Sequence, residues 1–570
     1  MLGMNYIKQD NSILFETLEN NDIINVQNYI PIYQNFFSLS SHNYNKINLN
    51  HKFHLESIEK STEKNKYDCK INDGENIYIK KSFFKFSPLL DPIKFMVGKY
   101  QKLEPDILSA LPQLDNNVCH KKVLHINNTA YVDSFFSYLS SKVLHKHNFY
   151  NAIDFYGSFL CIKKIFSVNI FDDLDYLTDS NFFIEECNKL FKIENVENFM
   201  YNNSTRSNIK KLQINKNEKI ILNLDEIKME EFDGLFKEIC VSPSKNNSSA
   251  DIVFEYNTKA TAETRSLKSD SSECSSNSSH TSHENSDFES DESDAEEDEG
   301  DEEDEEDEED EDEEEELVEA KLFNFPIQII ALESLDGTLD SCLENEKGLS
   351  NDQWKSCLFQ IIVSLIIYQD MFDFTHNDLH TNNIMYMKTE KQYLYYKYDN
   401  IHYKIPTYGK IWKIIDFGRA IYKFKGKRIC SDSFHKNGDA ATQYNCEPFL
   451  NNKKPRLEPN KSFDLCRLGC SLFDYFIDDS TENKSKYDEI TKLIDQWCKD
   501  DKGRNILYKT NGDERYPEFK LYKMIARSVH NLTPHSQIKN SLFKKFITSK
   551  KKINKKKNIL NVDLLPSYIN

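Results

Sequence analysis

The stretch that decides the fold is Phe374-Thr-His376-Asn-Asp378-Leu-His380-Thr-Asn-Asn383-Ile-Met, and Lys413-Ile-Ile-Asp416-Phe417-Gly418-Arg follows it along the chain. Asp416 closes a short apolar run that has the character of a strand. Phosphoryl transfer needs a carboxylate that orients an attacking hydroxyl and accepts its proton, and oxygen ligands that hold magnesium between phosphates. These residue types therefore predict Asp378 as the base, and Asn383 and Asp416 as the metal ligands.

Together, the two motifs resemble the catalytic loop H-x-D-x-x-x-x-N and the metal-binding loop D-F-G of the protein-kinase superfamily. The resemblance covers residues 320–480 well and residues 75–170 loosely. It implies an α+β, bilobal fold that uses ATP and Mg²⁺, with a small β-rich N-lobe and a mainly helical C-lobe. It also makes His376 and Gly418 supporting residues of the two loops. In detail, the motifs are similar to those of divergent serine/threonine protein kinases of giant DNA viruses of the mimivirus group.

Two further segments of the C-terminal half resemble kinase elements. Ser462-Phe-Asp464-Leu-Cys-Arg-Leu-Gly469 resembles the start of the large C-lobe helix, so Asp464 is expected to tie that helix to the catalytic loop. Ala441-Thr442-Gln-Tyr444-Asn-Cys-Glu447-Pro resembles the end of an activation segment, which would bring Thr442 near the substrate hydroxyl. Its Glu-Pro order departs from the usual Pro-Glu, and Glu458-Pro is a rival for the same role.

Residues 329–339 resemble the last N-lobe strand and the hinge that follows it. In that resemblance Leu332 is the gatekeeper, and the backbone from Glu333 to Leu335 offers adenine its hydrogen bonds. These residues are therefore the expected nucleotide contacts on the adenine side.

The N-terminal half carries the resemblance less clearly, because its first 130 residues contain no G-x-G-x-x-G phosphate loop. A lysine on a strand is needed to reach the nucleotide phosphates, and Lys85 is the best placed. Its competitors are Lys80, Lys81 and Lys94. The helix expected over 130–144 offers no Glu to pair with this lysine, which leaves three acids as its partner: Asp133, Glu230 and Glu231.

Two departures in the catalytic loop bear on regulation and substrate. Asn377 replaces the Arg with which many protein kinases read an activation-loop phosphate, so activity is expected not to depend on that switch. His380 stands where protein-serine kinases usually have Lys. Asp-Leu-His is the form seen in small-molecule phosphotransferases, such as aminoglycoside and choline kinases, and in some divergent protein kinases, which leaves the acceptor open.

Hydrophobic patterning predicts the elements around these motifs. Aromatic and β-branched residues favour a strand over 76–88, and two paired strands over 152–168. A helical period covers 130–144, and a longer one covers 351–372. Residues 325–332 have the composition of a buried strand.

Composition separates a folded body from one charged segment. The chain has 570 residues, a mass of 67.0 kDa and a formal net charge of −21. All but five residues of the run 287–316 are acidic, so the rest of the chain is close to neutral. Its aromatic content excludes a wholly disordered or fibrous protein. The acidic run is expected to be a disordered insertion, and two roles stay open for it: a solvated spacer, which is favoured, or a segment that binds basic proteins.

We expect five segments along the chain: an N-terminal extension (1–60), an N-lobe with a family-specific insertion (61–240), a Ser-rich and acidic disordered insertion (241–320), the last N-lobe strand with the hinge and C-lobe (321–543), and a basic C-terminal tail (544–570). The N-terminus lacks the features of a signal peptide, and no apolar run predicts a membrane span. Cysteines without paired spacing suit a reducing compartment. The sequence thus predicts a soluble, intracellular protein that is not secreted, in the host cytoplasm or the virion if viral, with no membrane or nucleic-acid partner.

These features favour an ATP-dependent protein kinase that transfers the γ-phosphate to Ser or Thr hydroxyls of protein substrates. Two alternatives stay open. The missing glycine loop and the missing paired Glu favour a catalytically weak pseudokinase or scaffold, which binds partners through its lobes and the acidic insertion. His380 favours a small-molecule phosphotransferase.

Overall fold

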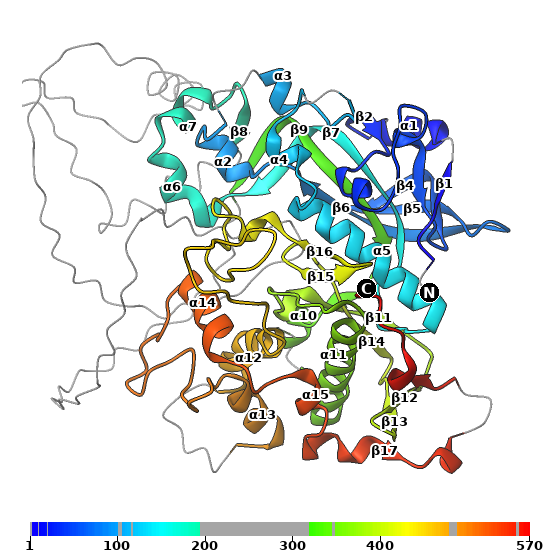
Figure 1. Ribbon diagram of the computed structural model, residues 1–570, viewed down its shortest axis with the longest axis vertical. Helices are drawn as coiled ribbons and strands as arrows, with labels where there is room; N and C mark the ends of the chain where they lie inside the picture. Colours follow the sequence, from blue (N-terminus) through cyan, green and yellow to red (C-terminus); the bar gives the residue numbers. More distant parts are fainter. Residues whose placement is uncertain are drawn as a thin grey trace, which may run out of the picture.

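The computed structural model describes residues 3–8, 11–19, 21–100, 105–115, 118–193, 318–344, 348–477, 487–553 and 558–570. The acidic run 287–316 and the alternative acids Glu230 and Glu231 lie outside the described residues. The fold is mixed α/β, with a β-rich N-terminal region on one side and a region of helices and small sheets on the other (Figure 1).

A large antiparallel sheet forms the N-terminal region, with strands in the order β2-β7-β9-β6-β5-β4 and with β8 also paired to β9. The strands are β2 (Ile23–Gln27), β4 (His54–Glu63), β5 (Lys66–Asn72), β6 (Ile77–Pro88), β7 (Phe155–Asn169), β8 (Phe191–Ile193) and β9 (Glu319–Glu333). The predicted strand over 76–88 is confirmed as β6, and the buried strand over 325–332 lies within β9.

The prediction of two paired strands over 152–168 is wrong, because this segment forms the single long strand β7. No turn divides it. Gly157 has φ +152° and lies where the register with β9 shifts, so the glycine is accommodated as a bulge within one strand.

Helix α5 (Thr129–His147) confirms the helix predicted over 130–144. Asn128 caps its first turn by accepting a hydrogen bond from the backbone of Ala130 over 3.1 Å. Most of its side chains are buried because the helix packs against both the sheet and the C-terminal region. Phe136, for example, contacts Tyr368 of the C-terminal region with 5.1 Å between ring centroids.

Helix α11 (Asn351–Phe372) is the central helix of the C-terminal region and has the predicted bounds. It begins with a capping box of Ser350 and Gln353. The helix is long and apolar enough to cross a membrane, but 89% of that apolar window is buried inside the protein, as in a core helix. Around it lie α10 (Asp340–Leu343), α12 (Phe463–Phe476), α13 (Glu489–Trp497), α14 (Phe519–Ser528) and α15 (Pro534–Gln537).

Small sheets complete the C-terminal region, in the orders β10-β11-β14, β17-β13-β12-β18 and β15-β16. Their strands are β10 (Gly337–Thr338), β11 (Ile384–Lys388), β12 (Tyr393–Tyr398), β13 (Ile401–Pro406), β14 (Lys410–Ile414), β15 (Ile421–Phe424), β16 (Lys427–Cys430), β17 (Ile547–Thr548) and β18 (Leu560–Asn561). Short elements elsewhere are β1 (Tyr6–Lys8), α1 (Ser12–Glu19), β3 (Ile47–Leu49), α2 (Pro92–Met96), α3 (Pro105–Leu108), α4 (Lys121–Leu124), α6 (Leu174–Thr178) and α7 (Asn181–Glu186).

Both ends of the chain differ from the extension and tail that we expect. Near the N-terminus, β2 joins the large sheet beside β7. Near the C-terminus, β17 pairs with β13 and β18 pairs with β12, and Tyr568 is buried. Apolar residues between the lysines of the last segment, such as Phe546 and Ile553, are buried, so the described part of the segment packs on the body of the protein.

Candidate active site

Asp464, in the first turn of α12, binds the backbone of the loop that carries Asp378. The Asp464 carboxylate accepts hydrogen bonds from the backbone of His376 at 3.0 and 3.1 Å and from that of Asn377 at 2.9 Å. Burial raises the pKa of Asp464, and these backbone donors oppose that rise. The structure thus brings Asp464 to the loop, where the resemblance expects it.

His376 links the loop to the segment that ends in Asp416. Its side chain is fully buried, its Nδ1 accepts from the Asp378 backbone over 3.3 Å, and its Nε2 lies 2.8 Å from the carbonyl of Ile415. This pattern requires the proton on Nε2. The ring therefore fixes the distance between the two motifs.

Strand pairing brings Asn383 and Asp416 to the same end of a small sheet. Asn383 directly precedes β11, and one residue separates Asp416 from the end of β14. In the antiparallel register, Ile384 lies opposite Ile414. The Ile415 backbone N–H also donates to the carbonyl of Asn383 over 3.0 Å. Two residues that are distant in sequence are neighbours because the strands between them pair.

The side chain of Asn383 is oriented by its own loop. Its Nδ2 donates to the carbonyl of Asp378 over 2.9 Å and lies 3.0 Å from Nε2 of His380. The amide nitrogen is thus committed to the loop, and Oδ1 is the atom that a metal ion could take as a ligand.

Lys85 reaches this site from β6. Its Nζ lies 2.7 Å from Oδ2 of Asp133 and 2.7 Å from Oδ1 of Asp416. The competing lysines lie elsewhere: Lys80 is over the ring of Phe53 at 3.5 Å, and Lys94 pairs with Asp91. Of the acids that sequence reasoning left open, Asp133 on α5 is thus paired with Lys85, and the other two lie outside the described residues.

The two carboxylates that share Lys85 differ in exposure and in charge balance. The Asp133 side chain is 4% exposed and that of Asp416 is 39% exposed. Burial raises the pKa of Asp133 in spite of Lys85. In Asp416 the charge and hydrogen bond of Lys85 outweigh burial, and the pKa is lowered. Asp416 is therefore the carboxylate that is accessible to a ligand, and Asp133 is the one that holds the lysine.

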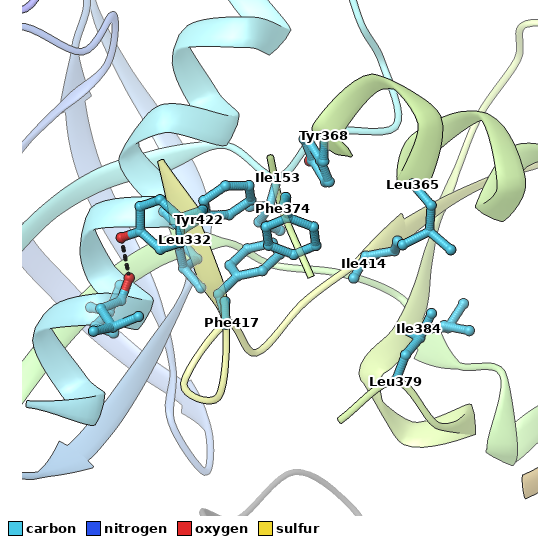
Figure 2. Close-up of a cluster of buried hydrophobic side chains, with 14 of the residues drawn as sticks. Ile153, Leu332, Leu365, Tyr368, Phe374, Leu379, Ile384, Ile414, Phe417 and Tyr422 are labelled. Carbon is cyan, nitrogen blue, oxygen red and sulfur yellow. Dashed lines mark hydrogen bonds between the residues drawn. The ribbon is translucent and has the colours of Figure 1, made fainter. Parts of the chain in front are cut away.

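Phe417 and Gly418 fix the geometry of the turn after Asp416, which itself has φ +60°. The Phe417 N–H donates to Oδ1 of Asp133 over 3.0 Å, and its ring is buried. Figure 2 shows the ring beside Phe374, with 6.0 Å between the ring centroids. The Gly418 N–H donates to Oδ1 of Asp416 over 3.2 Å, and a Cβ at Gly418 would lie 3.2 Å from the same oxygen. A side chain there would crowd the carboxylate.

Asp378 is contacted by two side chains that the sequence analysis did not identify. The Tyr522 hydroxyl donates to Oδ1 over 3.0 Å, and Nη1 of Arg419 lies 3.8 Å from Oδ2. Burial acts to raise the pKa of Asp378, but the nearby positive charges, above all that of Arg419 and also that of Arg467, outweigh it and hold the pKa well below its usual range. The carboxylate is therefore ionised at neutral pH and able to accept a hydrogen bond from a hydroxyl.

His380 is neutral at physiological pH, because burial lowers its pKa to about 4. It therefore cannot supply the positive charge that Lys supplies at this place in protein-serine kinases. Arg419 and Arg467 are the permanent cations nearby: Arg419 pairs with Asp439 over 2.7 Å, and Nε of Arg467 donates to the Tyr522 hydroxyl over 3.0 Å.

The segment with Thr442 does not form the contact expected of it. Thr442 is exposed, with φ +70°, and its carbonyl accepts from Arg527 over 2.8 Å. No hydrogen bond joins it to Asp378 within the described residues, and the neighbouring Tyr444 instead donates to Oδ1 of Asn377 over 2.8 Å. The expected position of Thr442 near the substrate hydroxyl therefore stays a prediction.

The segment expected to be the hinge, from Glu333 to Leu335, begins at the last residue of β9. Leu332 and Leu335 are each 8% exposed. The Glu333 N–H donates to the carbonyl of Asp154 over 3.1 Å, and its carboxylate accepts from the buried Nζ of Lys413. The Glu333 N–H is thus used within the fold, which leaves the backbone of Leu335 as the stronger candidate for contacting a base.

Tyr522, Arg419 and Arg467 are the site residues that sequence reasoning missed. Arg419 directly follows Asp-Phe-Gly in the sequence, but this position does not indicate that its side chain points toward Asp378. Tyr522 is 144 residues from Asp378 and belongs to no motif, so no local signal could identify it.

Comparisons with known proteins agree with this chemistry at a coarse level. No protein-family model matches the chain. A probable serine/threonine-protein kinase of Dictyostelium discoideum is 38% identical over 92 residues, which are 15% of this chain and 8% of that protein. A probable kinase of Invertebrate iridescent virus 3 is 30% identical over 110 residues, which are 19% of this chain and 21% of that protein. The chain thus matches only a small part of each relative, and both relatives are named as kinases.

Proposed function

We propose that this chain is an ATP-dependent protein kinase with a bilobal kinase fold, which transfers the γ-phosphate to Ser or Thr hydroxyls of proteins. The observation that carries the proposal is the meeting of Lys85, Asp416 and the Asp378–Asn383 loop at one place, although three separate segments supply them. The order of β4, β5, β6, β9 and β7 in the sheet, with α5 against it, also supports a kinase N-lobe.

The lysine and the hinge would hold the nucleotide. Lys85, kept in place by Asp133, would contact the phosphates of ATP, since its ammonium group already lies beside the more exposed Asp416. Leu332 and Leu335 would face the adenine ring from the hinge side. The ion pair between Lys85 and Asp416 is one that a phosphate group can replace without leaving Lys85 unpaired.

The donor set fits magnesium, with Oδ1 of Asn383 and the carboxylate of Asp416 as the ligands. Within the described residues no cluster of three or more His, Cys, Asp and Glu side chains could hold a metal ion alone. Two oxygen ligands from the protein are what magnesium takes when phosphate oxygens and water complete its shell. When bound, the ion would neutralise charge on the phosphates during transfer.

Asp378 would orient the acceptor hydroxyl and accept its proton. The loop around it is fixed by Asp464 from below and by the hydrogen bond between Asn377 and Tyr444. This neutral hydrogen bond takes the place in which many kinases use an Arg and a phosphorylated residue, which supports activity without that modification. Asp378 would thereby be held in position before the substrate binds.

The name of one relative supports the choice of acceptor, and two observations favour the alternatives. The relative from Dictyostelium discoideum is named as a serine/threonine-protein kinase, which supports protein Ser and Thr as acceptors. A pseudokinase remains the second candidate, because the turn between β4 and β5 consists of Lys64 and Asn65 in place of glycines. The small-molecule alternative depends on His380. Binding of basic proteins by the run 287–316 and an intracellular location stay predictions.

The proposal is tested in two steps with the purified full-length chain. Thermal unfolding with and without millimolar Mg-ATP measures nucleotide binding, and a rise in the midpoint is expected. Incubation with labelled ATP and a panel of generic proteins and aminoglycoside- or choline-type small molecules then identifies the acceptor. Label on protein Ser or Thr is the expected result. Binding without transfer to any acceptor would favour the pseudokinase, and label on a small molecule alone would favour the third reading.

A further inference from the structure

Tyr522 on α14 places its hydroxyl on the carboxylate of Asp378. The O–H donates to Oδ1 over 3.0 Å, which is within the range at which a general base contacts the proton that it accepts. A side chain of the protein itself therefore lies where the proposed function requires a substrate hydroxyl.

The tyrosine is held in this position from two directions. Nε of Arg467 donates to the same hydroxyl oxygen over 3.0 Å, so the oxygen accepts one hydrogen bond and donates the other. The ring stacks on Phe519 with centroids 5.4 Å apart and an interplanar angle of 18°, and Phe463 lies 6.1 Å away. The hydroxyl is thus oriented toward Asp378 before any ligand binds.

The surroundings of the ring suit a phosphorylated product. The guanidinium groups of Arg419 and Arg467 lie 5.8 and 5.2 Å from the centroid of the Tyr522 ring. A phosphotyrosine carries a charge of about −2 at neutral pH and is bound most strongly by guanidinium groups. Two permanent cations are therefore present where the new negative charge would form.

The protonation states also suit transfer. Burial raises the pKa of Tyr522, so its hydroxyl is protonated at neutral pH and needs a base before it can attack. Asp378 is ionised under the same conditions, because its pKa is held below the usual range. At neutral pH, Tyr522 is therefore a protonated nucleophile, and Asp378 is an ionised group that can accept its proton.

We propose that Tyr522 is an intramolecular phosphoryl acceptor, a modification site that the chain phosphorylates on itself. This inference rests on the proposed function. The Tyr522 O–H bond breaks and its proton passes to Asp378, while the oxygen forms a bond to the γ-phosphorus of ATP. The bond from that phosphorus to the bridging oxygen breaks, and ADP leaves with the electron pair. Proximity explains why a tyrosine reacts in an enzyme whose other acceptors are Ser and Thr.

The experiment follows phosphate on Tyr522 by peptide mass spectrometry, after the full-length chain has been incubated with Mg-ATP and a generic protein substrate. The variants are Tyr522→Phe, Asp378→Asn and, as a matched control, Tyr508→Phe. Tyr508 also donates its hydroxyl to a carboxylate, that of Asp474 over 2.9 Å, but on the surface and away from Asp378. A tagged Asp378→Asn chain mixed with the wild type tests whether transfer occurs within one molecule.

We expect up to one phosphate per chain on Tyr522 in the wild type and in Tyr508→Phe, and at least a hundredfold less in Asp378→Asn. The tagged Asp378→Asn chain should stay unmodified, and the wild-type rate should not change on dilution. The inference is overturned, and the proposed function kept, if the added substrate is phosphorylated while Tyr522 is not, or if Tyr508 is modified equally. If neither Tyr522 nor any added acceptor is phosphorylated, both fail. The wild-type result needs no variant to fold.

Discussion

The two sides of the candidate site differ in what already contacts their charged groups. On the nucleotide side, formed by Lys85, Asp133 and Asp416, one ammonium group is shared by two carboxylates. On the acceptor side, formed by Asp378 and Tyr522 with its arginine neighbours, the carboxylate already accepts a hydrogen bond from a hydroxyl. The nucleotide side has charges of its own to exchange with a ligand, whereas the acceptor side is filled by part of the chain.

This difference implies that the two substrates meet different obstacles. A phosphate group can replace Asp416 as the partner of Lys85, because Asp133 continues to hold the lysine. An acceptor hydroxyl must displace Tyr522, which is held by Arg467 and by stacking on Phe519. We therefore expect nucleotide binding to depend on the small difference in free energy between pairing Lys85 with Asp416 and pairing it with phosphate. We expect the rate of transfer to depend on the contacts that hold Tyr522 against Asp378.

The largest expected effect is on the acceptor side, in Asp378→Asn. Loss of the group that accepts the proton should lower the rate of phosphoryl transfer about a thousandfold. Mg-ATP binding should change little, since the Asp378 carboxylate is not one of the proposed nucleotide or metal ligands. Steady-state assays and calorimetric titration of the nucleotide measure the two quantities. Asp474→Asn is the matched control, because that carboxylate also accepts a tyrosine hydroxyl. Equal rates for wild type and Asp378→Asn would contradict the assignment.

The second largest effect is on folding, in Asp133→Ala. This change leaves Lys85 without its buried partner and removes the acceptor of the Phe417 N–H. The free energy of unfolding should fall by about 3 kcal/mol, as when one member of a buried pair is removed. Denaturant unfolding measures it. Glu59→Ala, which breaks an exposed pair with Lys70 on the same sheet, should lower the free energy of unfolding much less, because solvent screens that pair. Equal losses would show that Asp133 is not a buried anchor.

The sequence predicts a side of the site well when the residues of that side are close together along the chain, and poorly when they are far apart. Asp378, Asn383 and Asp416 lie in two short motifs joined by paired strands, and their residue types, together with the resemblance to kinase motifs, predicted that they meet. Lys85 and Asp133 are 48 residues apart, and their pairing depends on how α5 packs against the sheet. Sequence reasoning therefore reached Lys85 and left its partner open among three acids.

The acceptor side could not be predicted in the same way. Tyr522 reaches Asp378 only because α14 packs beside α12, and nothing in the pattern of α14 distinguishes this tyrosine from its neighbours. Thr442 was expected near the acceptor hydroxyl from its motif alone, and that expectation stays a prediction. The fold was predicted best for single elements, such as α11 and β6. It failed where β7 absorbs a glycine within one strand, because a bulge and a turn have similar local composition.

A third test concerns His380, which interacts with two residues of the catalytic loop. Its Nε2 contacts the side-chain amide of Asn383, and its imidazole lies close enough to Asp378 to be affected by the charge of that carboxylate. Burial lowers its pKa from 6.5 to about 4, so the unfolded chain binds the proton more readily between these pH values. The free energy of unfolding should therefore fall as pH drops from 6.5 toward 4, by up to about 3 kcal/mol from this group. His380→Gln should flatten that part of the pH profile, and His42→Gln, at an exposed histidine, should not. A profile unchanged by His380→Gln would contradict the prediction.

The smallest expected effect is on the nucleotide side, in Asp416→Asn. The amide keeps an oxygen that can coordinate a metal but loses the charge, so Mg-ATP should bind about tenfold more weakly, or about 1.4 kcal/mol. ATP without magnesium should bind nearly as in the wild type, because Asp133 still holds Lys85 beside the phosphates. Titrations with and without the metal ion separate the two cases. An equal loss in both would mean that Asp416 acts by positioning Lys85, and the metal-ligand assignment would then be wrong while the lysine assignment would stand.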